Sequence, residues 1–454
     1  MRANKHTHYI VVLLIYLFLL TGCGDSFMDA AGQTAQENVI LDDLGLPVHT
    51  IPPQATPTPA PTPFPEYDIS LMMVGDNLMH MGIVYSGKQQ DGSYNYNALY
   101  EDISEQLQTA DIKIINQETI LGGNELGFSG YPNFNSPTEV GDAIAAADFN
   151  VVLHASNHAA DQKLQGLENC AAFWRERHPE VMMLGIEGAE SSDMLLAGAA
   201  HACGERSADW HIDERGIGYM TVEGITFAIL NYTYGPNMEV IPSSIMGHLN
   251  ILCGYDPHSG QLDFTTLNPQ VPEDIAAARQ QADVVVVCPH WGTEYSTTPS
   301  SYQEKFALQM VEAGADVIIG THPHVVQPVE WIQAENGRRA LCFYSLGNYV
   351  STQKEGICML EAMAWITFHV DEYGVSIAES QSGAIPLVCQ YTSGPVRFEG
   401  VYLLQDYTQE QAARHGIRSY GGVNLSLDDL LKWSSEIFHE NTSEDATLDW
   451  PLNQ

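Results

Sequence analysis

The sequence predicts an α/β fold for the large central part of the chain, residues 67–355. In this part, short apolar runs alternate with amphipathic helical patterns, which is the order expected of strands and helices in α/β proteins. Most of the apolar runs also end in polar residues, as strands do when they lead to a ligand site. From about residue 360 strand-like runs dominate, so residues 356–454 are predicted to form a C-terminal β-rich extension that ends in helices.

The individual elements follow from local patterns. Pro272 suits the first turn of a helix, and Gly314 suits the residue after the last turn of another. The predicted central strands are 69–74, 112–115, 151–154, 284–288, 317–320 and 341–344, the predicted helices are 140–147, 272–282 and 302–313, and the extension has predicted strands 363–370 and 396–403 and helices 407–415 and 425–438.

The N-terminus has the pattern of an export signal. Arg2 and Lys5 precede an apolar run, residues 9–20, that is short for a membrane span but typical of a signal-peptide core. The run ends in Leu20-Thr21-Gly22-Cys23, which resembles a bacterial lipobox. We therefore expect a signal peptide over 1–22, a lipid on Cys23 and a location on the extracellular face of the cell membrane. A plain secretory signal, or an uncleaved anchor with an incidental cysteine, is the alternative.

Residues 23–66 are predicted to be a flexible linker, because residues 52–65 read PPQATPTPAPTPFP and favour an extended chain.

The formal net charge of the chain is −39, with only 18 Lys and Arg among 454 residues. This charge excludes a nucleic-acid partner, which would need a basic surface. The eight cysteines are scattered and lack a Cys-x-x-Cys pair, so neither a disulfide framework nor a thiolate zinc site is expected. Cys288 and Cys342 lie in apolar runs and are predicted to be buried.

The polar residues that follow the predicted strands form the candidate site. Strand ends in α/β folds converge on one edge, so we expect these side chains to meet there. Carboxylate, amide and imidazole groups without thiolate suit Mn, Fe, Zn or Mg ions. Each group alone has a plainer explanation, such as a turn, a helix cap or a packed loop, but six coincidences in order favour a metal site. The groups are Asp76, Asn116 and Glu118, Asn157 with His158 and Asp161, His290 with Glu294, His322 with His324, and Asn348.

The order of these motifs resembles the poly-gamma-glutamate capsule synthesis protein family of the CapA type, over residues 68–352. The family resemblance implies a calcineurin-like metallophosphatase architecture, a four-layer αββα sandwich with a dinuclear metal rim. The motifs are Val74-Gly75-Asp76, Asn116-x-Glu118, Asn157-His158-x-x-Asp161, His290-Trp291-Gly292-x-Glu294-Tyr295, Gly320-Thr321-His322-Pro323-His324 and Ser345-Leu346-Gly347-Asn348.

The resemblance also implies roles for the residues. His158 would be an acid or electrostatic stabiliser, with Asp161 beside it in the catalytic group. Asn116, Glu294 and Asn348 would orient the ligands, as could Asp161. Helix capping or turn formation explains Asp161, Glu294 and Asn348 equally well. One departure stands out, because the Asp-x-His of metallophosphatases is Asp76-Asn77-Leu78 here. One of two metal sites would then lack a histidine, unless His80 replaces it. The implied metal ligands are Asp76, Glu118, Asn157, His290, His322 and His324.

Three functions remain open from the sequence. The first is a surface-anchored, metal-dependent hydrolase or transferase in poly-gamma-glutamate-type capsule synthesis or processing, with an anionic polymer or wall-derived substrate and membrane polymer synthase subunits as partners. The second is a metal-dependent phosphoesterase. The third is a non-catalytic surface component of a polymer synthase or retention complex. A chain this acidic would repel a polyanion unless cations offset its field.

Overall fold

The computed structural model describes residues 65–187, 196–201 and 207–438. All described residues belong to one compact unit, which lies within residues 63–454. The signal-peptide and linker predictions, including Cys23, therefore lie outside the described residues. In the parts of the chain that the structure describes, no helix combines the length and apolar character needed to cross a membrane.

The first sheet has nine strands in the order β19-β18-β16-β1-β2-β3-β4, with β15 paired to β1 and β17 paired to β16. Strands β1 to β4 run parallel, whereas β16 to β19 are antiparallel to their neighbours. Strands from the predicted extension therefore complete the same sheet as the first strand. The bounds are β1 Tyr67–Asn77, β2 Ile112–Asn116, β3 Val151–Leu153, β4 Met182–Leu184, β15 Asn348–Val350, β16 Leu360–Asp371, β17 Gly374–Ile377, β18 Gly383–Thr392 and β19 Arg397–Leu403.

The second sheet has eight strands in the order β13-β14-β12-β11-β8-β7-β6-β5, and β9 with β10 form a separate hairpin. Its central strands β8, β11, β12 and β14 are parallel. All seven residues of β11 are buried, as expected for a parallel strand covered on both faces. The bounds are β5 Leu196–His201, β6 Ser207–Ile212, β7 Gly218–Val222, β8 Ile225–Thr233, β9 Cys253–Tyr255, β10 Leu262–Leu267, β11 Val284–His290, β12 Val317–Ile319, β13 Val329–Gln333 and β14 Arg339–Phe343.

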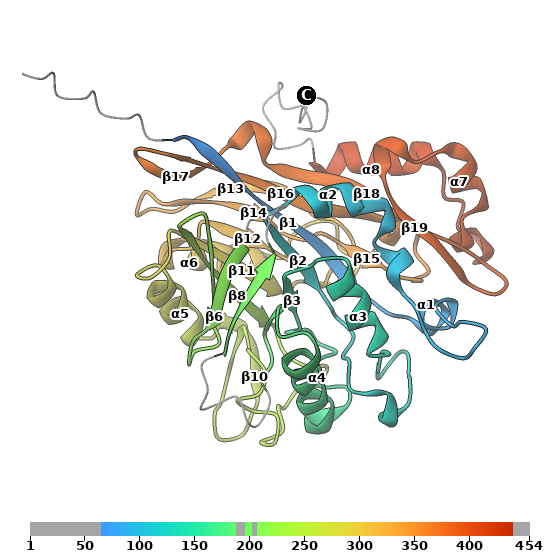
Figure 1. Ribbon diagram of the computed structural model, residues 1–454, viewed down its shortest axis with the longest axis horizontal. Helices are drawn as coiled ribbons and strands as arrows, with labels where there is room; N and C mark the ends of the chain where they lie inside the picture. Colours follow the sequence, from blue (N-terminus) through green and yellow to red (C-terminus); the bar gives the residue numbers. More distant parts are fainter. Residues whose placement is uncertain (1–64, 188–195, 202–206, 439–454) are drawn as a thin grey trace, which may run out of the picture. The chain divides into compact units, whose positions relative to one another are not determined.

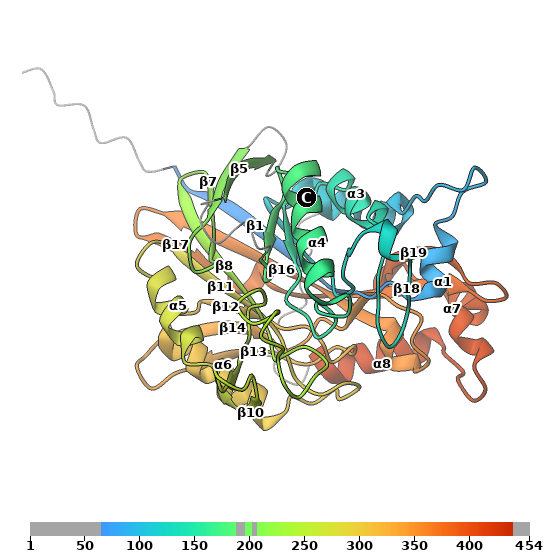
Figure 2. The same cartoon turned by 90° about the horizontal axis from the view of Figure 1, so that it is seen from below.

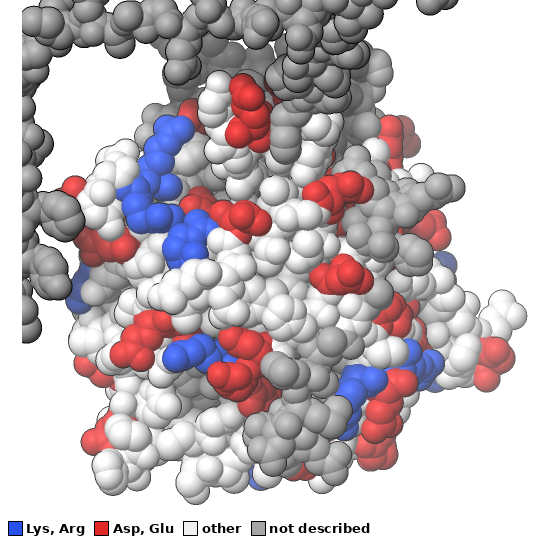
Figure 3. Space-filling model, turned by 60° about the vertical axis from the view of Figure 1, so that its left-hand side comes forward, with Lys and Arg blue, Asp and Glu red and all other residues white. Residues whose placement is uncertain are grey.

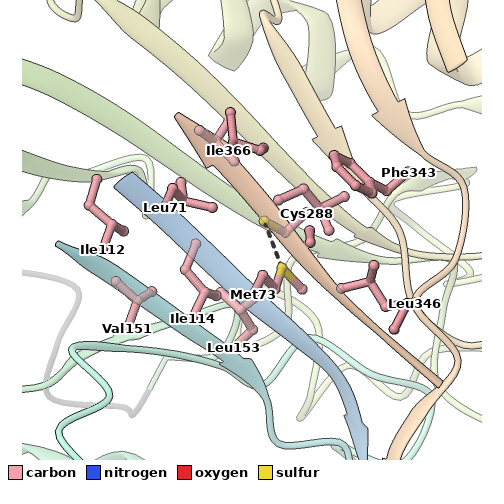
Figure 4. Close-up of a cluster of buried hydrophobic side chains, with 14 of the residues drawn as sticks. Leu71, Met73, Ile112, Ile114, Val151, Leu153, Cys288, Phe343, Leu346 and Ile366 are labelled. Atoms are coloured by element: carbon pink, nitrogen blue, oxygen red, sulfur yellow. Dashed lines mark hydrogen bonds between the residues drawn. The ribbon is translucent and has the colours of Figure 1, made fainter. Parts of the chain in front are cut away.

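The two sheets face each other across a common apolar core. Met73 of β1 and Cys288 of β11 touch there, with 3.9 Å between their sulfur atoms (Figure 4). The residues next to these two along each strand, such as Met72 and Val287, point to the outer faces of the sheets instead. Each sheet is thus covered on both sides, which explains why its central strands are apolar runs rather than alternating patterns.

Helices cover the outer faces of both sheets. Helices α1 to α4 pack against the first sheet, and α5 and α6 pack against the second (Figures 1 and 2). Helices α7 and α8 contribute Ala412 and Leu430 to the core cluster that the inner face of the first sheet shares. The bounds are α1 Met81–Ser86, α2 Ser104–Thr109, α3 Glu139–Ala146, α4 Lys163–Arg177, α5 Gln270–Ala278, α6 Ser301–Ala313, α7 Gln409–Arg414 and α8 Leu427–Phe438.

The α/β class predicted from the sequence is confirmed, and each predicted central strand lies in β1, β2, β3, β11, β12 or β14. The helix expected to begin near Pro272 begins at Gln270, and α6 ends before Gly314, whose φ is 131°. Cys288 and Cys342 are buried as predicted, and the cysteines within the described ranges are free thiols. On the face shown in Figure 3, the Lys and Arg side chains form small groups that lie beside Asp and Glu side chains.

Candidate metal centre

The ends of strands from both sheets meet at one place. Asp76 lies near the end of β1, and Glu118 follows β2. His290 is the last residue of β11 in the other sheet. All six residues expected as metal ligands are buried, with at most 3% of each exposed. Neighbouring strands of the first sheet bring three of them together, and the facing of the two sheets brings these to the three histidines of the second sheet. The six residues are Asp76, Glu118, Asn157, His290, His322 and His324.

Asp76 joins the two halves of the site. Its Oδ1 accepts a hydrogen bond of 2.7 Å from the Asn116 amide, and its Oδ2 accepts one of 3.1 Å from the His322 backbone N–H. Its carboxylate lies 3.3 Å from Nδ1 of His324 and 3.8 Å from Nδ1 of His290. Asn116 thus holds the carboxylate of a first-sheet residue against the histidines of the second sheet.

Glu118, His322 and His324 offer ligand atoms that all lie within 4.8 Å of one another, which is the arrangement of a group that could hold a metal ion. Both Glu118 carboxylate oxygens and the His322 Nδ1 are buried without a hydrogen-bond partner in the described part of the chain. Buried polar atoms are rarely left in this state, because each one costs about 1–3 kcal/mol. A divalent cation would satisfy all three atoms, so the donors fit one.

Burial and the close approach of several ionisable groups shift the pKa values of the carboxylate and histidines in this cluster. Burial raises the pKa of Glu118 well above its usual value; His324 opposes the rise, and the charges of Asp76 and Glu294 add to it. Burial alone would lower the pKa of His324, but Glu118 and Asp76 raise it to about 9. His322 and His290 have strongly lowered pKa values because of burial and their histidine neighbours. His322 and His290 are therefore neutral at neutral pH, which is the state in which imidazoles bind metals.

Asn157 and His290 form the second part of the site. The Asn157 Oδ1 lies 2.9 Å from the His290 Nε2, which in turn lies 3.8 Å from Glu118. The other ring nitrogen of His290 lies 3.0 Å from the Thr321 hydroxyl, and this contact fixes the orientation of the ring. An amide oxygen and an imidazole nitrogen therefore point toward the same space as the Glu118 carboxylate.

His158 and Asp161 form a pair at the edge of this cluster. The Nδ1 of His158 lies 2.8 Å from the Asp161 carboxylate, which also accepts a 2.6 Å hydrogen bond from the Phe134 N–H. The His158 ring packs edge-on against Phe134, with 4.7 Å between centroids. The carboxylate and the phenyl ring together fix the rotation of the imidazole.

The remaining predicted residues differ in what they touch. Asn348 contacts the site directly: its Oδ1 lies 3.1 Å from the His324 Nδ1, and its amide donates to the His324 carbonyl. Asn348 therefore orients a candidate ligand. Glu294 is exposed, and it acts on Glu118 and His324 through its charge.

The backbone around the site is closely packed and locally strained. A Cβ added to Gly75 would lie 2.1 Å from the Gly347 carbonyl, so only glycine lets β1 approach this loop. His322 and His324 have φ values of 100° and 60°, a region that side chains other than Gly, Asn or Asp rarely adopt. Each such residue costs about 1–3 kcal/mol, and strain of this kind concentrates at functional sites.

Leu78, the residue for which the family resemblance implied a histidine, is buried, with 2% exposed. His80 lies nearby, and Phe134 separates it from His158, because the Phe134 ring contacts both imidazoles. Burial and the charges of His324 and His158 lower the His80 pKa to about 4. His80 is not in the group that Glu118, His322 and His324 form.

Two residues of the site were not identified from the sequence. Tyr234 packs its ring against His322, with 4.7 Å between centroids, and Asn237 contacts both the Asn157 amide at 3.1 Å and the His158 Nδ1 at 3.4 Å. Both follow β8, an apolar run that ends in polar residues like the other strands. The rule that found the other groups applies equally to this strand end.

The fold and the site define an α/β protein with a buried carboxylate–histidine cluster where the strand ends of two facing sheets meet. The family model described as "Bacterial capsule synthesis protein PGA_cap" matches residues 70–201 and 208–353, which is more than half of the chain. The chain belongs to this bacterial capsule synthesis protein family, as its motifs predicted.

Two curated relatives carry capsule-related names. "PGA biosynthesis protein CapA" of Bacillus subtilis (strain 168) is 30% identical over 227 residues, 50% of this chain and 48% of that protein. The match thus spans about half the length of this relative. "Capsule biosynthesis protein CapA" of Bacillus anthracis is 27% identical over 331 residues, 72% of this chain and 70% of that protein. Among solved structures, a hypothetical protein from Thermus thermophilus aligns at 14% identity with a TM-score of 0.35, over 70% of this chain and 99% of that one.

Proposed function

We propose that the protein is a metal-dependent hydrolase or transferase that acts in the synthesis or processing of a poly-gamma-glutamate-type capsule polymer. Capsule synthesis is in the description of the family and in the names of the two Bacillus relatives. The single observation that supports catalysis is the buried group of Glu118, His322 and His324, in which both Glu118 carboxylate oxygens and the His322 Nδ1 have no hydrogen-bond partner among the described residues.

We also propose that the two facing sheets and their outer helices form the four-layer αββα sandwich of calcineurin-like metallophosphatases. This is supported by the three core clusters, one between the sheets and one under the helices on each side. It is further supported by the position of the cluster at the carboxyl ends of parallel strands, where such folds bind their ligands.

One or two divalent ions, of Mn, Fe, Zn or Mg, would lower the pKa of a bound water and balance the negative charge that develops on the substrate. The residues of the chain prepare this site in three ways. Asn348 and Thr321 fix the rings of His324 and His290. Asp161 holds Nδ1 of His158, which leaves Nε2 free to exchange a proton with the substrate. The six candidate ligands are Asp76, Glu118, Asn157, His290, His322 and His324.

Metal content tests this proposal. We expect the purified full chain to carry one or two equivalents of a transition metal by elemental analysis. The His322→Ala variant should lose metal, because it removes one member of the three-residue group. His258→Ala is the matched control, since its side chain is 95% exposed. A metal-free protein, or equal metal in all three proteins, would contradict the metal-dependent mechanism.

The buried Leu78 favours one alternative, a non-catalytic component of a polymer synthase or retention complex. The test is polymer production by cells whose own copy is replaced with the His158→Ala variant. Loss of polymer while the variant stays folded supports catalysis. Normal polymer with the variant, together with loss of polymer when the whole protein is removed, supports the scaffold. Metal-restored cleavage of a chromogenic phosphodiester would favour the phosphoesterase alternative.

The lipid anchor at Cys23, the extracellular face of the membrane and association with membrane synthase subunits are proposals that depend on the sequence motif. Metabolic labelling with a fatty acid tests the anchor. We expect label in the natural protein and none in the Cys23→Ser variant. Label in the variant, or its absence from both, would show that Cys23 is not the lipidation site.

A further inference from the structure

A cavity of about 240 Å³ lies beside the candidate metal centre. Aromatic rings from four parts of the chain line it: the loop after β8, strand β10, the loop after β11, and helix α6. Its volume suits one ring-sized group rather than an extended chain, because whole-ligand pockets are usually larger, roughly 300–1,000 Å³. The aromatic residues are Tyr234, Phe264, Trp291, Tyr302 and Phe306.

Tyr234 forms the wall between the cavity and the metal centre. Its ring packs on His322 on one side, with 4.7 Å between centroids, and on Phe264 on the other, with 5.9 Å. Its backbone N–H donates to the His290 carbonyl at 2.9 Å, which fixes it to the end of β11. The cavity and the metal centre therefore adjoin at the Tyr234 ring, and a group that extends past this ring from a bond at His322 would enter the cavity.

Two polar side chains of the cavity, Gln303 and Trp291, are already bonded within the protein. The Gln303 Oε1 accepts from the Ser300 N–H at 2.9 Å, and its amide donates to Gln327 at 2.8 Å. The indole N–H of Trp291 donates to the Tyr344 carbonyl at 3.0 Å. These groups have little capacity left for a strongly polar ligand, so the wall presents mainly ring faces.

Among the described residues that line this cavity there is no Lys, Arg, His, Asp or Glu. The nearest charges are unfavourable to an anion: Glu294 helps to raise the pKa of Tyr234, and Asp263 that of Cys253, after burial in both cases. Lys305 is close to Asp263, and its ammonium donates to the Thr265 carbonyl. A carboxylate placed here would lose water without gaining a partner, and aromatic faces are negative.

We propose that this cavity binds an uncharged ring of the substrate, either a sugar or an aryl group, and excludes the carboxylate side chains of a poly-gamma-glutamate chain. The inference rests on the proposed function only for the position of the reacting bond. The substrate of this site would then carry an uncharged ring next to the bond that reacts, so a glutamate polymer alone would not fill the site.

Binding to the metal-stripped full chain tests this inference independently of metal content. The probes are N-acetylglucosamine for a sugar, phenol for an aryl group and γ-linked triglutamate for the anion, followed by saturation-transfer NMR. We expect saturable binding of at least one uncharged ring and no displacement by triglutamate. The arm that binds identifies the kind of ring.

Two variants locate the binding. Phe264→Ala and Tyr302→Ala truncate half-exposed rings, 41% and 44% exposed, and each should weaken binding of the ring probe at least tenfold. Tyr373→Ala removes a ring that is 89% exposed on the turn between β16 and β17, and it should change nothing. Thermal melts confirm that each variant is folded. Absence of ring binding, displacement by triglutamate, or equal affinity in all folded variants would overturn the inference.

Discussion

Replacing Glu118 with Gln should separate the stability of the fold from the binding of metal. The substitution keeps the shape of the side chain and removes a buried carboxylate whose two oxygens have no hydrogen-bond partner among the described residues. His324 keeps Asp76 as an acidic neighbour, 3.3 Å from its Nδ1, so no buried cation is left alone. The metal-free variant should therefore be at least as stable as the natural protein, in contrast to most substitutions of buried groups.

With metal bound, the natural protein should become more stable than the Glu118→Gln variant. A ligand present at 100 times its dissociation constant stabilises the folded state by about 2.7 kcal/mol. A unit the size of residues 63–454 has an unfolding entropy of about 0.8 kcal/mol/K, estimated per residue. The natural protein should thus gain about 3 °C in melting temperature on adding saturating Mn or Zn, and Glu118→Gln should gain little, because a neutral amide binds divalent cations weakly.

Differential scanning calorimetry after chelation, with and without metal, measures both effects. Glu361→Gln is the matched control. Glu361 is another fully buried carboxylate without partners among the described atoms, burial raises its pKa, and it lies outside the three-residue group. It should keep the full metal-induced shift. The reasoning is refuted if Glu118→Gln is clearly less stable without metal, or if metal stabilises it as much as it stabilises the natural protein.

Three further predictions concern the backbone, the catalytic pair and pH. Gly75→Ala should cost at least about 2 kcal/mol in urea denaturation, because its Cβ would meet the Gly347 carbonyl at 2.1 Å, whereas Gly421→Ala, with open space around it, should be neutral. Asp161→Asn should keep the metal content but lower turnover more than tenfold, because it removes the charged partner of His158; unchanged turnover would exclude the pair from catalysis. Burial lowers the pKa of His154 from 6.5 to about 3, so the unfolded state binds more protons than the folded state between these pH values. The contribution of His154 to stability is therefore complete above pH 6.5, and the free energy of unfolding should fall by about 3 kcal/mol by pH 4.5. Calorimetry on the His154→Gln variant should show a flatter dependence of stability on pH.

The sequence predicts the parts of the site better than their arrangement. Polar residues after apolar runs mark strand ends, and this local rule places Asp76, Glu118 and His290 at the ends of strands without any knowledge of the tertiary structure. It fails for Asn237 only because the apolar run of β8 was not singled out. The rule cannot show that two sheets face each other, and the contact between Asp76 and His322 exists only because they do.

The C-terminal strands also show that a local pattern predicts a strand but not its partner. The runs now in β16 and β19 were recognisable as strands, but nothing local indicates that β16 pairs with β1 over eight residue pairs, from Tyr67 with Val370 to Val74 with Met363. Antiparallel pairing between segments this far apart in the chain is decided by burial of both faces, which a pattern in one segment does not contain. The segment predicted as an extension therefore supports β1, the strand that carries Asp76.

Several unfavourable features of this fold lie together at the candidate metal centre. A buried carboxylate without partners among the described residues, two histidines with positive φ and a glycine that tolerates no side chain all lie within the segments that carry Glu118, His322, His324 and Gly75. A surface that only holds partners together gains nothing from such strain, and destabilising arrangements of this kind persist when a function depends on them. A bound cation removes part of the cost by satisfying Glu118 and His322, which is why a metal centre explains this cluster better than a purely structural role does.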